Sequence, residues 1–379
     1  MTEKSGLHSS FEPISTVIGG TGLGGDIRLT FASKTSCLVL LVSFLAIFIA
    51  FFNSNVRTID ALAAGLQNGT YSQAEAVDLA RQKHFKDFFG KVASLNIRHP
   101  EGPVIADERH KMRWLYKTVE ASVYRYVADH QGAKAASMLQ VLHSTVYLML
   151  TLVMTLLIMT RISGRNSGNF VAVSAAVFFA WFTFTNIINF TREEFTFVET
   201  FCIAAGVYFS LDRRLIPFLL ILLLAVSNRE TGALFGVIYF IINWRTPWFW
   251  LPLIAGPILL LAVNADLFAP YFQHYVSVLL APDKAKPTIF DFWTYPTLMV
   301  TKSFLQLAVL LIPIAAVIWK AWGQPGAGRL GLITVIYLFV LLRGAPINNV
   351  FPYLLLLPLV LGFSAMVVRN SDDLDAKVA

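Results

Sequence analysis

The sequence predicts an all-α protein, a polytopic transmembrane bundle of about ten helices with a helical outer loop between the first two spans. Of its 379 residues 56% are hydrophobic, and the mean hydropathy is +0.62. Only 14% are charged, whereas a soluble domain carries about 25%. Leu- and Phe-rich runs of up to about twenty residues recur, the length of helix that crosses about 30 Å of hydrocarbon. These observations exclude an ordinary soluble globular protein.

The predicted spans follow the apolar runs in chain order. Leu215–Val226 and Gly232–Asn243 are short for full crossings, so they are tilted, re-entrant or parts of one broken helix. The ten runs are Ser36–Phe52, Met138–Thr160, Phe170–Phe190, Phe195–Leu211, Leu215–Val226, Gly232–Asn243, Phe249–Ala265, Thr297–Trp319, Leu330–Leu342 and Phe351–Val368.

The distribution of Lys and Arg places both termini in the cytoplasm. With that orientation the short inner segments carry more cations than the short outer ones, as the positive-inside bias requires. The sequence then divides into a cytoplasmic tail (1–34), a transmembrane domain (35–368) with an outer loop (53–137), and a second cytoplasmic tail (369–379). The glycine-rich stretch 19–25 lacks the Gly-Lys-Ser/Thr ending of a phosphate-binding loop, so we assign it to a flexible tail.

The outer loop itself contains helix signals. Ser72 and Glu75 have the spacing of a capping box at the start of Gln73–Phe89. A second segment, Asp107–Asp129, combines apolar residues at helical spacing with many cations. Such a helix suits a membrane surface, and packing within the loop is an equally good interpretation.

Several functional classes find little support in the composition. The net charge of +7 reflects cations gathered on the cytoplasmic side of a membrane protein, so we expect no nucleic-acid partner. Cys37 and Cys202 both lie in apolar runs, which provides no basis for a disulfide framework. The seven histidines lack the spacing that places two metal ligands on one helix face.

Charged residues at the ends of the outer-facing spans provide the functional signal. An ionisable residue at membrane depth costs about 2.5 to 3.5 kcal/mol, so a cluster on one face predicts a functional pocket. Arginine grips phosphate or carboxylate oxygens with two parallel hydrogen bonds. The structural alternative is that these arginines pair with acids only to lock helices together. The groups are Arg57 with Asp60, Arg192 with Glu193 and Glu194, Arg229 with Glu230, and Arg343 near Asn348 and Asn349, with Glu199 two turns from Arg192.

This layout resembles that of the C-type (GT-C) glycosyltransferases, membrane enzymes that use sugars carried on polyprenyl phosphate. The similarity rests on the long outer loop after the first helix, on the acids of the second outer loop, and on two motifs. One motif is Ser227-Asn228-Arg229-Glu230-Thr231-Gly232, and the other is Arg343 followed by Asn348-Asn349-Val350-Phe351-Pro352-Tyr353.

The resemblance implies a role for each of these side chains. Asp60 and either Glu193 or Glu194 would be the loop acids, one of them serving as general base or as ligand of a divalent metal ion. Arg229 and Arg343 would hold the carrier phosphate, assisted by Arg192. Asp60 lacks the adjacent second acid that many members show, which leaves the base and the metal requirement open. We assign supporting roles to Glu199, Glu230 and Asn348.

The predicted function is therefore transfer of a sugar from a polyprenyl-phosphate donor to an envelope glycan, lipid or polysaccharide acceptor at the outer face of the inner membrane. Its partners would be the lipid-linked sugar, the membrane lipid and the acceptor. Three alternatives stay open: a transporter or flippase for a lipid-linked or anionic solute, a polysaccharide polymerase or ligase, and a scaffold subunit. The absence of an apparent internal repeat favours the enzyme over the transporter.

Overall fold

The computed structural model describes residues 22–31, 37–38, 40–49, 115, 123, 126–127, 130–131, 133–163, 194–263, 302–344 and 351–378. Within these ranges the chain is helical apart from short turns and contains no strand, which confirms the all-α prediction. The predicted span 170–190, most of the outer loop and the late loop 266–296 lie outside the described residues.

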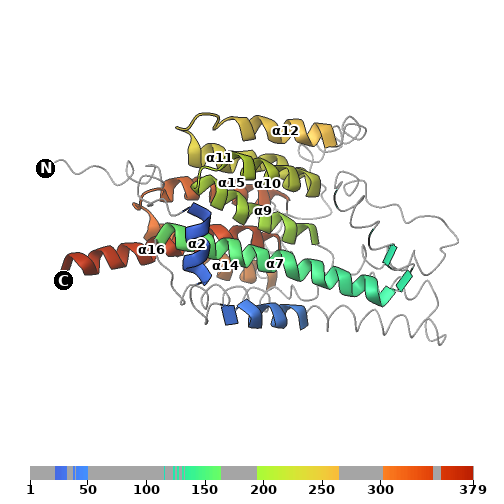
Figure 1. Ribbon diagram of the computed structural model, residues 1–379. Helices are drawn as coiled ribbons and strands as arrows, with labels where there is room; N and C mark the ends of the chain where they lie inside the picture. Colours follow the sequence, from blue (N-terminus) through green and yellow to red (C-terminus); the bar gives the residue numbers. More distant parts are fainter. Residues whose placement is uncertain are drawn as a thin grey trace.

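The described helices follow the predicted apolar runs closely, and most lie side by side with roughly parallel axes (Figure 1). The largest differences are at the two ends of the chain, where α2 precedes the first apolar run and α16 continues through the predicted cytoplasmic tail. Their bounds are α2 Gly22–Phe31, α7 Ala133–Ser163, α9 Glu194–Leu211, α10 Leu215–Asn228, η6 Glu230–Phe235, α11 Gly236–Asn243, α12 Leu251–Val263, α14 Lys302–Ala321, α15 Ala327–Gly344, η10 Phe351–Leu356 and α16 Leu357–Val378.

Three turns gather at one end of the bundle, which we name the basic end: 212–214, 244–250 and 322–326. Side chains join the helix ends that meet there. Asn243 Nδ2 donates to the carbonyl of Ser210, Arg329 Nη1 to that of Ile242, and Arg369 Nη1 to that of Ile162. Among the described residues, Arg329 and Arg369, two of the cations predicted to face the cytoplasm, therefore lie at this end.

The two short predicted spans form an antiparallel hairpin. The 14 residues of α10 leave the basic end and extend about 21 Å. The chain reverses at Arg229, and η6 with α11 returns about 24 Å to the same end. One continuous broken helix is therefore excluded. Both arms are shorter than about 30 Å of hydrocarbon.

The core of the bundle is apolar, and so is much of its outer surface. Phe197, Tyr208 and Phe235 are almost completely buried. Large apolar side chains recur at helical spacing on the outward faces, where they stay exposed. Examples are Ile216, Leu220 and Leu223 on α10, Ile254, Ile258 and Leu261 on α12, and Leu332, Val335 and Phe339 on α15. Soluble monomers rarely expose apolar stripes of this extent.

Among the described residues, one helical segment is long and apolar enough to cross a membrane by itself. It is Val141–Ser163 of α7, and 56% of its most apolar window is buried inside the bundle. The shorter apolar helices have 10–17 residues. This segment is a candidate membrane helix, and the arrangement of ten spans stays a prediction.

The assignment of the glycine-rich stretch to a flexible tail is wrong for its second half. Residues from Gly22 onward form α2, which lies across α7 near the basic end (Figure 1). This helix was not predicted because its segment contains three glycines, and glycine has low helix propensity. Two features stabilise the position of α2: it packs against α7, and its Asp26 side chain is buried, with only 1% exposed.

Gly232 is required where η6 approaches α10. A Cβ atom at this position would overlap the backbone carbonyl group of Ala225. We expect Gly232→Ala to lower the free energy of unfolding by about 1 to 3 kcal/mol, because the backbones must separate. Denaturant titration in mixed micelles measures this. Gly362→Ala is the control, since its Cβ would make only ordinary contacts near 3.6 Å, and equal losses in both variants would contradict the close approach.

Candidate functional site

The site predicted around Arg229 is centred on a carboxylate buried in α9. Glu199 lies among side chains that are fully enclosed, including Val198, Cys202 and Ile203, and is itself only 2% exposed. Apolar composition makes α9 a core helix, so this acid requires a partner. Thr200 on the same helix donates its hydroxyl to the carbonyl of Thr196 and is satisfied locally.

Arg229 and Thr231 provide the partners of Glu199. Arg229 Nη1 donates to Glu199 Oε2 at 3.0 Å, and Thr231 Oγ1 donates to Glu199 Oε1 at 2.5 Å. Both carboxylate oxygens are therefore engaged by the segment that joins α10 to η6. Thr231 was absent from the predicted site residues, although it belongs to the motif that drew attention to Arg229.

The backbone at Arg229 explains how its side chain reaches α9. Residue 229 is extended (φ −157°, ψ 149°) between two helical segments. Its N–H donates to the carbonyl of Ala225, and its own carbonyl accepts from the N–H of Gly232. The helix break thus fixes the direction of the guanidinium group.

Along the long axis of the bundle, the pair lies closer to the end opposite the basic end. Glu199 is thirteen residues before Asp212 at the basic end, a rise of about 20 Å along α9. The Glu199 side chain is 3% exposed, whereas that of Arg229 keeps 23% exposure. A buried acid therefore orients a cation that a ligand can still reach, which is the geometry an anion site requires.

Tyr337 of α15 is a further polar group in this region that the sequence analysis missed. It is 4% exposed, and its ring lies edge-on to Phe235 of η6 at 6.0 Å. Within the described part of the chain this hydroxyl has no hydrogen-bond partner. A tyrosine in an apolar run is usually core, so the sequence offered no signal for its position.

The other predicted site residues are only partly placed by the structure. Glu230 is half-buried as the first residue of η6. Glu194 begins α9 and Arg343 is next to the last residue of α15, so both backbones lie at the end opposite the basic end. Asp60, Arg192, Glu193 and Asn348 lie outside the described residues. In the described ranges no three metal-ligating side chains converge.

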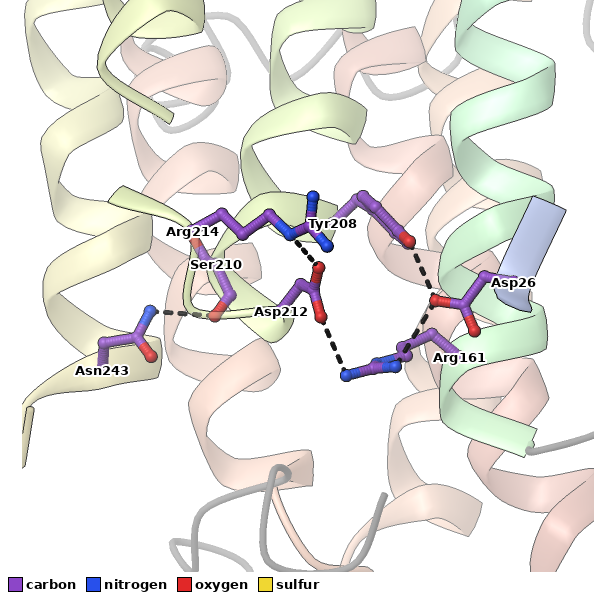
Figure 2. A network of polar contacts seen from close by, with 7 residues as sticks. All are labelled: Asp26, Arg161, Tyr208, Ser210, Asp212, Arg214 and Asn243. Carbon is purple, nitrogen blue, oxygen red and sulfur yellow. Dashed lines mark hydrogen bonds and ion pairs between the residues drawn. The ribbon is translucent and has the colours of Figure 1, made fainter. Parts of the chain in front are cut away.

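A second buried polar network lies at the basic end and differs in character (Figure 2). Arg161 of α7 lies between two acids, with Nη1 3.5 Å from Asp26 Oδ2 and Nη2 3.0 Å from Asp212 Oδ1. Tyr208 donates its hydroxyl to Asp26 at 2.8 Å, and Arg214 pairs with Asp212. Two acids and two arginines compensate each other, so this network connects α2, α7 and the α9–α10 turn.

Comparison with known proteins yields no relative. No protein-family model matches the chain, and no curated protein or solved structure is significantly similar to it.

Proposed function

We propose that the chain is a multi-pass protein of the inner membrane with ten spans and cytoplasmic termini. The exposed apolar stripes on α10, α12 and α15 support this, because in a lipid solvent these side chains are not exposed to water. The basic end supports the orientation, since cations concentrate on the cytoplasmic side. The candidate helix in α7 agrees with this arrangement.

We further propose that the protein transfers a sugar from a polyprenyl-phosphate donor to a glycan or lipid acceptor at the outer face. The observation that carries the proposal is Arg229, a cation 23% exposed that a buried acid orients at a helix break. When the bond between the sugar and the phosphate breaks, negative charge develops on the lipid phosphate. A fixed guanidinium group stabilises that charge.

The remaining roles follow from the chemistry of the transfer. The acceptor hydroxyl attacks the anomeric carbon, and a carboxylate removes its proton. Glu199 is unsuited to this task because both of its oxygens accept hydrogen bonds. We therefore keep Asp60, Glu193 and Glu194 as the candidate acids, one of which would serve as general base or as ligand of a divalent metal ion. Arg343 and Arg192 would complete the phosphate site, supported by Glu230 and Asn348.

A transporter or flippase for a lipid-linked or anionic solute is the second candidate. The Glu199–Arg229 pair favours it, since the acid in direct contact with Arg229 is committed to hydrogen bonds and leaves a site suited to binding. Such a protein would use Arg229 to hold the anion without breaking a bond.

The test is a transfer assay with Arg229→Lys. This variant keeps a cation beside Glu199 but loses the planar fork, so we expect transfer to fall roughly tenfold to a hundredfold. Purified protein in lipid is incubated with radiolabelled polyprenyl-phosphate sugars and a crude envelope acceptor fraction. Release of polyprenyl phosphate and label on the acceptor are measured together.

Arg214→Lys is the matched control, because it makes the same change at the basic end. We expect it to leave transfer unchanged. Wild-type transfer by Arg229→Lys would contradict the phosphate-binding role. Arg229-dependent binding of the lipid donor, with no release by the wild type, would support the transporter instead.

A further inference from the structure

Three arginines from three separate connections meet at the basic end. Arg213 lies in the turn between α9 and α10, Arg245 in the turn between α11 and α12, and Arg329 in the first turn of α15. The bonds from Asn243 to the carbonyl of Ser210 and from Arg329 to that of Ile242 hold these connections together. We call Arg213, Arg245 and Arg329 the arginine cluster.

One indole ring organises the cluster. The guanidinium carbons of Arg245 and Arg329 lie 5.3 Å and 5.8 Å from the centroid of the Trp244 ring. Both guanidinium groups therefore lie within cation–π range of the same indole ring. Arg329 is 3% exposed, whereas Trp244 is 49% exposed, so the cluster extends from the interior to the surface.

The three cations repel each other. Arg329 precedes the apolar run that begins at Leu330. Its burial, and the positive charges of Arg245 and Arg213, lower its pKa to about 10. It stays protonated at neutral pH. Asp212, which precedes Arg213 in the same turn, has its carboxylate between Arg161 and Arg214. Positive charge is thus concentrated where an anion would relieve the repulsion.

The backbone at this end is strained, and its surface is aromatic. Among the described non-glycine residues, those with positive φ are Arg213 (56°) and Trp248 (65°), both in the turns that build the cluster. Strained conformations of this kind concentrate at ligand sites. Trp248, Trp250 and Trp322 are 59%, 41% and 44% exposed, and exposed tryptophans mark the headgroup depth of a bilayer.

We propose that the arginine cluster binds the phosphate headgroup of an anionic phospholipid in the leaflet at the basic end. Basic pockets between membrane helices on the cytoplasmic side suit such headgroups. The exposed tryptophans favour a lipid over free phosphate, because they place the cluster beside acyl chains. The site is separate from Arg229, and its existence depends on membrane insertion but not on sugar transfer.

The test is lipid retention by the full-length protein. Purified protein in detergent is titrated with phosphatidylglycerol or phosphatidylcholine, and bound lipid is counted by native mass spectrometry. We expect the wild type to retain phosphatidylglycerol preferentially. Arg245→Gln, which changes an exposed side chain, is expected to weaken retention about fivefold.

Lys320→Gln is the matched control, since it removes one exposed cation at the same end and is expected to leave retention unchanged. Arg213→Gln is the second variant if Arg245→Gln does not fold, and the same loss is expected. Equal losses in Lys320→Gln and the cluster variants would overturn the proposal, as would equal retention of the two lipids. Full displacement of phosphatidylglycerol by inorganic phosphate would assign the site to free phosphate instead and would also overturn it.

Discussion

Arg161→Met is expected to lower the free energy of unfolding by about 3 to 5 kcal/mol, because it leaves two buried acids without their shared cation. Asp26 and Asp212 are 1% and 8% exposed, and Arg161 contacts both. Titration with SDS in mixed micelles, followed by circular dichroism, measures the loss. We also expect α2 to detach, which proteolysis near residues 22–31 would detect.

Arg214→Met is the control for this prediction. Its guanidinium group pairs with the same Asp212, but its side chain is 43% exposed. Ion pairs of this kind contribute up to about 1 kcal/mol, so the expected loss is small. If both variants lost the same free energy of unfolding, the burial of Arg161 would not explain its contribution to stability.

The second large effect concerns the pair between α9 and the helix break. Arg229→Met should lower the free energy of unfolding by about 3 kcal/mol, since it leaves Glu199 buried and charged. The expected loss is at the low end of the range because Arg229 is partly exposed. Adding Glu199→Gln removes the uncompensated charge, so we expect the double variant to regain most of the loss.

The double variant also separates the two interpretations of Arg229. If the pair only locks helices together, the stable double variant transfers sugar at the wild-type rate. If Arg229 holds the carrier phosphate, transfer stays abolished although stability returns. We expect the second result, measured in the radiolabelled-donor assay. A double variant as unstable as Arg229→Met would contradict the ion pair itself.

The sequence was most informative about the bounds of helices that coincide with a continuous apolar run. α9 begins one residue before its predicted start and ends at the predicted residue, and α15 extends the predicted run by a few residues. The bounds of such helices follow from the length and composition of the apolar run alone, whichever helices pack against it. The sequence also predicted the two short segments in their order. Their antiparallel arrangement follows from the extended backbone of Arg229, which the sequence does not indicate.

The sequence was less informative where distant residues meet. Arg229 was expected to contact an acid under the structural alternative, yet only packing identifies that acid as Glu199, thirty residues earlier. Tyr337 gave no signal because a hydroxyl in an apolar run does not indicate its direction, and Thr231 stood in the Arg229 motif without any sign that it would contact Glu199. α2 was missed for a related reason: contacts with α7 and Tyr208 stabilise a segment whose own propensity is poor.

The docking of α2 has a consequence for biosynthesis. Asp26 accepts the hydroxyl of Tyr208, which lies 182 residues later in the chain, and Arg161, which also pairs with Asp26, follows it by more than a hundred residues. The ribosome has therefore released α2 long before its binding surface exists. Asp26 therefore cannot contact Arg161 and Tyr208 until α7 and α9 have both been synthesised. Closure of the basic end is consequently a late assembly step, completed only after α9 has entered the bundle.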